Sequence, residues 1–436
     1  MTAAPQTPRA IVVGGGLAGL ASAAALARSG YQVDVLESRA FPGGRATSYP
    51  APGDDTEHID NCQHVLLRCC TGLLDFYERL GVRDAIEFHR TFYFLEPGGR
   101  LSVLERGRFP PPLHFAESFA RMRFLSWTDK LSIALAMSAI EREWPQRDDL
   151  DSMTMLAWLR EKSQPPRAIE RFWRQVLVSA VNEELDRMAA SHGLQVFAQG
   201  FLSSGDAYEM GIPRVPLAQL YSPDAWRRFP GVKLHFRSPA EQIKVENGRV
   251  VAVSAAGVDW CADVYVSAVP FERAAALVPA LGLDFTGWEH SPITGVHLWF
   301  DRPVTDLPHA TLLDRTMQWM FNKRDGRYLQ LVVSASRGLT EMPRGEVIDL
   351  ARRELAEFLP KTAEARIEKA HVVKEVRATY SARPGLEALR PPARTAIPNL
   401  FLAGDWTRTG WPATMEGAVR SGYLAAQAIT ETGVIS

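Results

Sequence analysis

Three glycines with a spacing typical of a phosphate-binding turn lie near the start of the 436-residue chain. Gly14, Gly16 and Gly19 stand in G-x-G-x-x-G register. In such a turn the first glycine permits a tight bend, the second lets the backbone approach a pyrophosphate, and the third allows close helix packing. A helix that begins here presents its positive N-terminal end to the phosphates. Leu17 and Ala18 open that helix and belong to the predicted site.

An acidic side chain follows at the distance that nucleotide sites use for the ribose. Glu37 lies 18 residues beyond Gly19, where its carboxylate can accept hydrogen bonds from both ribose hydroxyls. Glutamate here fits an adenosine without a 2′-phosphate, so the sequence favours FAD or NAD over NADP. Ser38 and Arg39 follow directly and complete this part of the predicted site.

The elements that must position these residues follow one another in the expected order. Ala10–Val13 is a short β-branched run that predicts a buried strand, and Leu17–Arg28 favours a helix. Tyr31–Leu36 alternates as a second strand, which gives a βαβ unit. A lone glycine motif is weak evidence, but strand, glycines, helix, strand and acid together are strong. The competing interpretation, a structural glycine turn in another α/β protein, is disfavoured by this order.

Two further segments have residue types that suit a cofactor. Gly43 and Gly44 allow the chain to pass close to a ligand, and the Arg45 guanidinium can pair with phosphates. Near the other end, the predicted strand 399–405 finishes in Gly-Asp, and 415–430 is compatible with a helix. Two half-sites at opposite ends of the chain are hard to explain as ordinary turns.

These motifs resemble the flavin amine oxidase and carotenoid desaturase superfamily. The resemblance implies that the Gly-Gly-Arg segment runs beside FAD and that Gly404 and Asp405 contact the ribityl and phosphate groups. It also implies that the helix from Met415 points its N-terminus at the flavin ring, where the helix dipole stabilises negative charge on reduced flavin. FAD is therefore the predicted cofactor, and no metal site is predicted.

Four stretches narrow the resemblance to the squalene-associated FAD-dependent desaturases of hopanoid biosynthesis, the hydroxysqualene dehydroxylases. They are 60–64 (DNCQH), 297–303 (HLWFDRP), 402–407 (LAGDWT) and 412–417 (PATMEG). The subfamily implies reductive removal of an allylic hydroxyl from hydroxysqualene, with a hydride from reduced flavin delivered to an allylic cation. The alternatives are an oxidative carotenoid or phytoene-type desaturase, an amine or protoporphyrinogen oxidase, and a non-catalytic prenyl-binding module of the Rab GDP-dissociation-inhibitor type.

The superfamily implies an α/β fold with two domains. The first is a Rossmann-type FAD-binding domain of the glutathione-reductase-like type, and the second is a helix-rich α+β substrate domain. In this pattern the alternating strands of 232–269 belong to the FAD domain, with the backbone near Ala240 against adenine. The predicted boundaries are 1–75, 205–275 and 392–436 for the FAD domain, and 76–204, largely helical in pattern, and 276–391 for the substrate domain.

The catalytic residues are less securely indicated. His64 falls on the motif expected near the flavin, and an ordinary histidine pKa suits proton exchange near neutrality. We take it as the proton donor, with Asp60 orienting or charging it and Gln63 binding FAD. The sequence leaves open an alternative in which His64 binds flavin only through its backbone and Asp60 caps a turn.

Composition limits the partners. With 49 basic against 50 acidic side chains, the chain lacks the cationic field that non-specific nucleic-acid binding requires, so no nucleic acid is expected. A hydrophobic content of 46% excludes a mainly disordered chain and suits an apolar isoprenoid substrate. The chain shows one convincing dinucleotide fingerprint, so the reducing electrons are expected from an external donor, either free NAD(P)H or a partner.

The membrane is the remaining candidate partner. The longest apolar stretch, Leu131–Ile140, is shorter than the approximately 20 residues that a spanning helix needs. Phe109–Trp127 is aromatic, and Arg121, Arg123 and Lys130 lie in or beside it, so it lines an apolar tunnel, rests on a membrane, or packs as a helix into the domain core. The four cysteines suit reduced thiols, which points to the cytoplasm, with the inner face of the cell membrane as the hypothetical contact.

Overall fold

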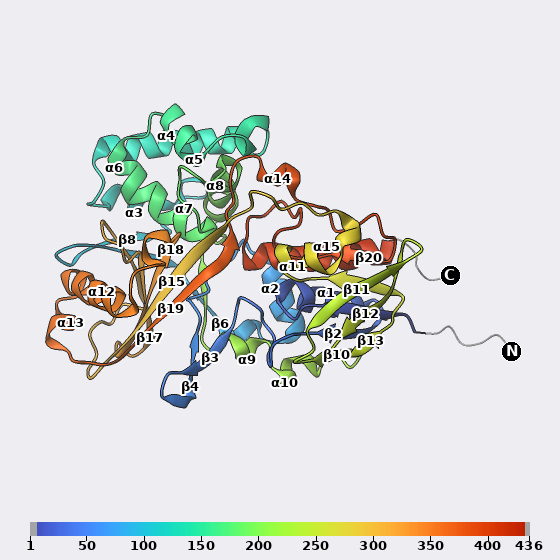
Figure 1. Ribbon diagram of the computed structural model, residues 1–436. Helices are drawn as coiled ribbons and strands as arrows, with labels where there is room; N and C mark the ends of the chain where they lie inside the picture. Colours follow the sequence, from blue (N-terminus) through green and yellow to red (C-terminus); the bar gives the residue numbers. More distant parts are fainter. Residues whose placement is uncertain (1–6, 432–436) are drawn as a thin grey trace.

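A parallel sheet holds the first βαβ unit in the computed structural model, which describes residues 7–431. Its strand order is β10-β2-β1-β14-β20, and every neighbouring pair is parallel. Widely separated parts of the chain therefore lie side by side in one sheet (Figure 1). The strands are β1 (Arg9–Val13), β2 (Gln32–Leu36), β10 (Val232–His235), β14 (Val264–Ser267) and β20 (Leu400–Leu402).

Alternate side chains of β1 face two different layers. Ala10 and Val12 pack toward the helices α1 (Leu17–Arg28) and α15 (Met415–Glu431). Ile11 and Val13 pack on the opposite side, against a three-stranded sheet and α11 (Phe271–Leu277). The small sheet consists of β11 (Ala240–Glu246), β12 (Arg249–Ala255) and β13 (Val258–Trp260). The predicted Rossmann-type α/β unit is thus present.

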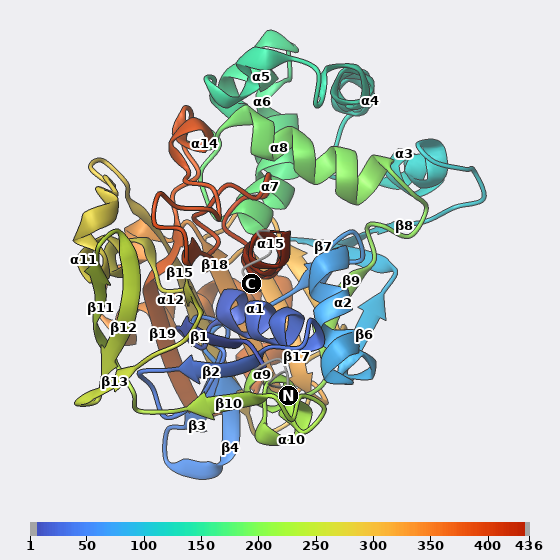
Figure 2. The ribbon, with the colours of Figure 1, turned by 90° about the vertical axis from the view of Figure 1, so that its right-hand side faces the viewer.

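Helices α1 and α15 lie against each other, as Figure 2 shows near the centre of the molecule. Their approach requires glycine at position 422, because a Cβ there would lie 2.2 Å from the Ala18 carbonyl oxygen and 2.8 Å from the Ser22 nitrogen. The first and last helices of the chain are therefore held in contact by backbone packing. This contact brings the two ends of the sequence to one site.

A seven-stranded sheet of order β19-β15-β18-β17-β16-β7-β8 forms the second half of the molecule. One face packs on α12 (Arg344–Phe358), and the other faces a layer of helices. All neighbouring pairs are antiparallel except β16 with β7. The strands are β7 (Thr91–Glu96), β8 (Arg100–Glu105), β15 (His290–Phe300), β16 (His309–Leu312), β17 (Trp319–Arg324), β18 (Tyr328–Ser334) and β19 (Ile367–Tyr380).

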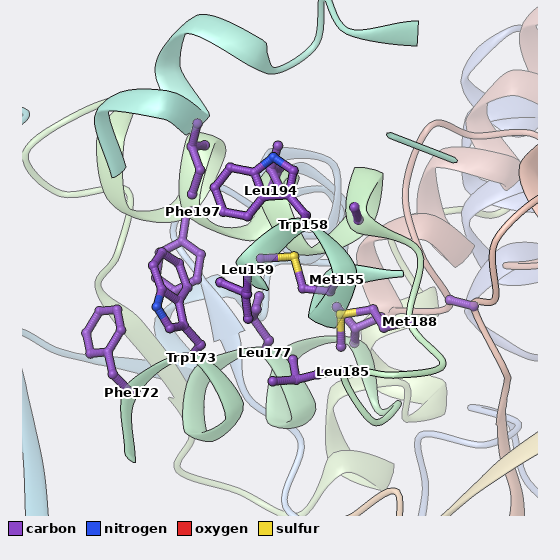
Figure 3. Packing of buried hydrophobic residues seen from close by; sticks show 14 of the residues in the cluster. Met155, Trp158, Leu159, Phe172, Trp173, Leu177, Leu185, Met188, Leu194 and Phe197 are labelled. Carbon is purple, nitrogen blue, oxygen red and sulfur yellow. The ribbon is translucent and has the colours of Figure 1, made fainter. Parts of the chain in front are cut away.

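The helical layer is held together by an aromatic core. Trp173 and Phe197 meet edge to face with ring centroids 4.8 Å apart, and Trp158 packs beside them (Figure 3). The helices are α3 (Ala116–Arg121), α4 (Trp127–Glu143), α5 (Met155–Glu161), α6 (Pro166–Ala168), α7 (Arg174–Val181) and α8 (Ala190–Phe197), and α8 continues into a π-helical turn, Ala198–Leu202.

One prediction for this half was incomplete. Residues 86–105, expected within a largely helical segment, form β6 (Ile86–His89), β7 and β8. The aromatic residues of β7 and its β-branched Thr91 favour a strand over a helix. The domain boundaries remain a prediction.

Short elements lie between and beside the two halves. They are β3 (Ser48–Ala51), β4 (Asp54–Asp60), β5 (Leu66–Leu67), α2 (Thr71–Leu80), β9 (Met210–Pro213), α9 (Leu217–Leu220), α10 (Pro223–Trp226), α13 (Lys361–Glu364) and α14 (Leu386–Leu389). Within residues 7–431, no helix combines the length and the apolar character needed to cross a bilayer.

Candidate active site

A cavity of about 680 Å³ extends from the carboxyl ends of the parallel strands to the face of the seven-stranded sheet beneath α7 and α8. The predicted cofactor residues line it with one exception, Gly19. Those lining it are Gly14, Gly16, Leu17, Ala18, Glu37, Ser38, Arg39, Gly44, Arg45, Gln63, Ala240, Gly404, Asp405 and Met415. The fold thus brings both ends of the sequence to a single cavity.

Gly19 lies behind the turn rather than on its surface. A Cβ at this position would stand 1.9 Å from the Gly14 carbonyl oxygen, so no side chain fits. This matches the packing role expected of the third glycine of the motif. Its absence from the cavity wall therefore follows from its function in the turn.

The backbone of the turn comes close to the Gly-Gly-Arg segment. Gly14 and Gly44 have φ values of +109° and +61°, which L side chains rarely adopt. A Cβ on Gly44 would lie 2.9 Å from the Gly16 Cα, and the Gly43 N–H donates to the Gly15 carbonyl at 2.8 Å. The resulting cradle is lined by backbone, as a dinucleotide pyrophosphate requires.

Glu37 is buried at the end of β2 and held by backbone donors. Its Oε2 accepts from the Gly15 N–H at 2.7 Å, and its Oε1 accepts from the Arg39 N–H at the same distance. The Ser38 hydroxyl also donates to Oε1 at 3.1 Å. The carboxylate is therefore fixed at the cavity wall, where the predicted ribose contact would be made.

An ion pair joins the two half-sites. Arg45 Nη2 lies 2.5 Å from Asp405 Oδ1, and Arg45 Nη1 donates to the Ala378 carbonyl at 3.1 Å. Burial opposes the charge of Arg45, but the Asp405 carboxylate outweighs it and raises the pKa of the guanidinium. The sequence predicted that Arg45 faces phosphates; the structure adds its carboxylate partner 360 residues away.

Arg390, which sequence reasoning missed, positions the segment that follows Asp405. The side chain is only 1% exposed and donates to the backbone carbonyls of Asp405, Thr407 and Trp411. It also donates to the Thr409 hydroxyl at 3.0 Å and pairs with a carboxylate on α14. No local motif marks this arginine. Because Trp411 lines the cavity, Arg390 shapes the wall next to α15.

His64 lies on the cavity wall, but its pKa contradicts the predicted proton exchange near neutrality. Burial lowers the pKa to about 4, although the charge of Asp60 opposes this shift. The ring is therefore neutral at pH 7. Its Nε2 lies 3.0 Å from Asn61 Oδ1 and 3.4 Å from Cys62 Sγ.

Asp60 was predicted to orient or charge His64, but its hydrogen bonds go to other groups and it does not line the cavity. Its Oδ1 accepts from the Ser48 hydroxyl at 2.6 Å and from the Leu217 N–H at 2.9 Å. The alternative in which Asp60 caps a turn is closer to this geometry, although the backbone it binds is the start of α9 at Leu217 rather than its own turn. Its carboxylate acts on His64 only electrostatically.

Lys323 is the second residue that sequence reasoning missed. Its Nζ donates to Gln63 Oε1 at 2.7 Å and lies 3.7 Å from Asp60 Oδ2. Burial lowers the pKa of Lys323, and the neighbouring Asp60 partly counters this effect. Because 260 residues separate Lys323 from Gln63, no spacing in the sequence could indicate this contact.

The part of the cavity above the seven-stranded sheet is lined mainly by aromatic and aliphatic side chains, with polar ones such as Gln175, Asn182 and Glu375 among them. Trp319 and Phe321 stack with ring centroids 5.7 Å apart and an interplanar angle of 11°. The remaining aromatic lining residues are Phe92, Phe94, Phe201 and Trp411. Every residue from 109 to 127 is described, and none lines the cavity, so the predicted tunnel lining by that segment is wrong. Instead, Met122, Phe124 and Leu125 are buried in the core of the helical layer, whereas Phe109, Leu113 and Trp127 are exposed.

The site fits the predicted dinucleotide. The glycine cradle leaves room for a pyrophosphate, and the buried Glu37 carboxylate lies where a ribose would be held. The N-terminus of α1 faces the cavity at Leu17. At the opposite wall, α15 begins at Met415, beside residues 411–414 of the lining, so its positive dipole end faces the same space. Arg273, also on the wall, donates to the Ala240 carbonyl at 3.3 Å.

Comparisons with known proteins also indicate a flavin-binding protein. The model of the flavin containing amine oxidoreductase family matches residues 17–430. The chain is 26% identical to the probable zeta-carotene desaturase of Synechococcus elongatus, over 98% of this chain and 100% of the relative. It is 26% identical to the 15-cis-phytoene desaturase of the same organism, over 97% and 95%. The fold resembles an oxidoreductase from Methanosarcina mazei, with a TM-score of 0.73, 18% identity, and coverage of 97% and 100%.

Proposed function

Because the chain belongs to the flavin-containing amine oxidoreductase family, and its cofactor is FAD, we propose that it acts on a long apolar isoprenoid. The specific reaction that we propose is the reductive dehydroxylation of hydroxysqualene to squalene. The observation that carries this proposal is the aromatic, apolar extension of the FAD cavity, lined by Trp319 and Phe321 beside the polar segment of Gln63 and His64.

The reaction balances as follows. The allylic C–O bond breaks, the oxygen leaves as water after taking up a proton that comes from solvent, and a hydride forms the new C–H bond. Reduced FAD, when bound, supplies that hydride. The electrons are replaced by an external donor, free NAD(P)H or a partner protein, which we propose because the sequence contains a single dinucleotide fingerprint.

The protein's contribution is to position the substrate, exclude water and stabilise charge. The stacked faces of Trp319 and Phe321 offer negative quadrupoles to an allylic cation. Neutral His64 can exchange hydrogen bonds with the departing hydroxyl, but its pKa of about 4 leaves little imidazolium to protonate it at pH 7. Lys323 holds Gln63, and the Lys323–Asp60 pair sets the local charge from behind the wall.

A second candidate is the oxidative desaturation of a carotenoid precursor. It is favoured by the similarity to carotenoid desaturases over nearly the whole length of the chain. Both candidates use the same apolar cavity and differ in the direction of electron flow.

The reaction products distinguish the dehydroxylation from the oxidative desaturation. Protein reduced anaerobically and mixed with hydroxysqualene is expected to form squalene as the flavin absorbance returns. The oxidised protein is mixed in parallel with phytoene and a quinone. Desaturated product there, with no squalene in the first reaction, would replace our proposal with the second candidate. A preparation that takes up no FAD would favour the prenyl-binding module instead.

A variant sharpens this experiment. Trp319→Leu should slow the dehydroxylation while FAD remains bound, because it removes an aromatic face from the cavity. Trp260→Leu is the matched control, since Trp260 lies on β13 outside the cavity wall. Equal rates for the two variants would show that the aromatic lining contributes nothing to the reaction.

A further inference from the structure

Helix α4 turns a row of large apolar side chains toward solvent. Trp127, Leu131 and Leu135 are 72%, 64% and 64% exposed. They are spaced four residues apart, so they lie along one side of the helix. The opposite side, with Ile133 and Ile140, is buried in the aromatic core of the helical layer.

The exposed side of α4 carries no charge over its first three turns. Between Trp127 and Ser138 the other exposed residues are Thr128 and Ala134, and the first exposed charged side chain is Glu141. A helix on the surface of a globular protein ordinarily presents charged and polar residues to water. This arrangement therefore indicates a surface that meets something other than water.

Further apolar side chains lie in the loop before α3. Leu113 is 61% and Phe109 is 44% exposed. Four of the five most exposed large apolar side chains among residues 7–431 belong to this region, counting Leu113 with the three of α4. Figure 2 shows α3 and α4 at the same end of the molecule, and the Lys130 ammonium on α4 donates to the Ala120 carbonyl of α3 at 2.7 Å. We call this set, Phe109, Leu113, Trp127, Leu131 and Leu135, the apolar rim.

Basic side chains border the apolar rim. Arg108 and Arg121 are well exposed and pair only at the surface, with Glu117 and Glu105. Arg106 and Arg123 add two further positive charges in the same segment. The charge next to the apolar rim is thus net positive, which suits the negative surface of a bilayer containing anionic phospholipid.

The loop of the apolar rim follows a strand that lines the cavity. Leu104 of β8 lines the cavity, and two residues later the chain enters the loop that carries Phe109 and Leu113. Helix α3 packs on β8. The apolar rim is therefore close in sequence to the cavity wall, although none of its residues lines the cavity.

We propose that the apolar rim docks this protein on the surface of an anionic phospholipid bilayer, with α4 lying in the interface. The side chains of Trp127, Leu131 and Leu135 enter the acyl boundary, and the bordering arginines meet the phosphates. That the docked protein takes its substrate from the bilayer rests on the proposed function, whereas the docking itself does not. The sequence-based hypothesis placed membrane contact on 109–127; the structure moves its centre to α4.

The test uses the full-length protein with FAD bound and two kinds of vesicle, phosphatidylcholine alone and phosphatidylcholine mixed with phosphatidylglycerol. Sedimentation should show binding to the mixed vesicles that weakens at high salt. The double variant Leu131→Glu, Leu135→Glu should bind at least about tenfold more weakly, because two exposed leucines no longer enter the apolar boundary. Leu389→Glu is the matched control, since Leu389 is 65% exposed on α14 and lies outside the apolar rim.

The outcomes separate docking from catalysis. All variants should retain bound FAD and turn over substrate dispersed in detergent, whereas the double variant should lose turnover of substrate embedded in vesicles. Vesicle binding without any turnover would support docking and overturn the proposed reaction alone. Wild-type vesicle binding by the double variant would overturn the docking proposal. The proposal would also be overturned if the wild-type protein does not bind vesicles and is instead a dimer, while the double variant is a monomer.

Discussion

Replacing Arg390 by methionine tests whether one buried guanidinium holds the wall beside the flavin end of the cavity. The substitution keeps most of the side-chain volume but removes the donors to the carbonyls of Asp405, Thr407 and Trp411. Each buried acceptor left without a partner costs about 1–3 kcal/mol. Three acceptors together would give roughly 3–9 kcal/mol, and relaxation toward the cavity places the expected loss near the lower end, about 4 kcal/mol.

The measurement is urea unfolding of the apo and FAD-loaded proteins, with FAD affinity from a fluorescence titration. We expect Arg390→Met to lower both the free energy of unfolding and the affinity for FAD. The reason is that the loop held by Arg390 includes Asp405, which lines the cavity, and this loop would shift. Arg394→Met is the control: its pair with Glu431 at 3.3 Å is exposed and is worth at most about 1 kcal/mol. Equal unfolding free energies for the two variants, with unchanged FAD affinity, would refute the reasoning.

Three further predictions concern the same site. Gly44→Val should abolish FAD binding, because its Cβ would press on the Gly16 Cα at 2.9 Å; yellow protein after gel filtration would contradict this. The pKa of His64 falls from 6.5 to about 4 on folding, so its neutral form contributes stability above pH 6.5 that is lost as the pH falls toward 4. His64→Gln should therefore reduce the slope of unfolding free energy against pH in that window, by up to about 1.4 kcal/mol per pH unit. The double variant Lys323→Met, Asp60→Asn should lose about 1–3 kcal/mol less free energy of unfolding than the two single variants lose in sum, because the two side chains interact. Losses that simply add would exclude this coupling.

Local features of the site could be predicted from the sequence because their determinants are local. Helix Leu17–Arg28 has its predicted limits, since glycines precede it and Gly30, with φ of +89°, follows. The two central strands were placed to within a residue, because a short apolar run before a glycine cluster has few other structures open to it.

Contacts between distant segments could not be predicted in the same way. Lys323 meets Gln63 across 260 residues, and Arg390 has no motif around it. The pKa of His64 depends on burial, which only the assembled fold determines. Likewise Leu131–Ile140 carries no charged residue, and the packing of α4 on the helical layer decides which of its sides is exposed.

The cofactor site depends on the association of the chain's two ends, and this dependence has a thermodynamic consequence. Arg45 and Asp405 pair across 360 residues, and Gly422 allows α15 to seat on α1. Neither half-site is complete without the other, so FAD binds the assembled state and stabilises it by RT ln(1 + [FAD]/Kd). At a hundredfold excess over Kd this is about 2.7 kcal/mol, comparable to the loss expected from removing Arg390. The apolar rim lies on helices outside this linkage, so membrane docking and cofactor retention can vary independently.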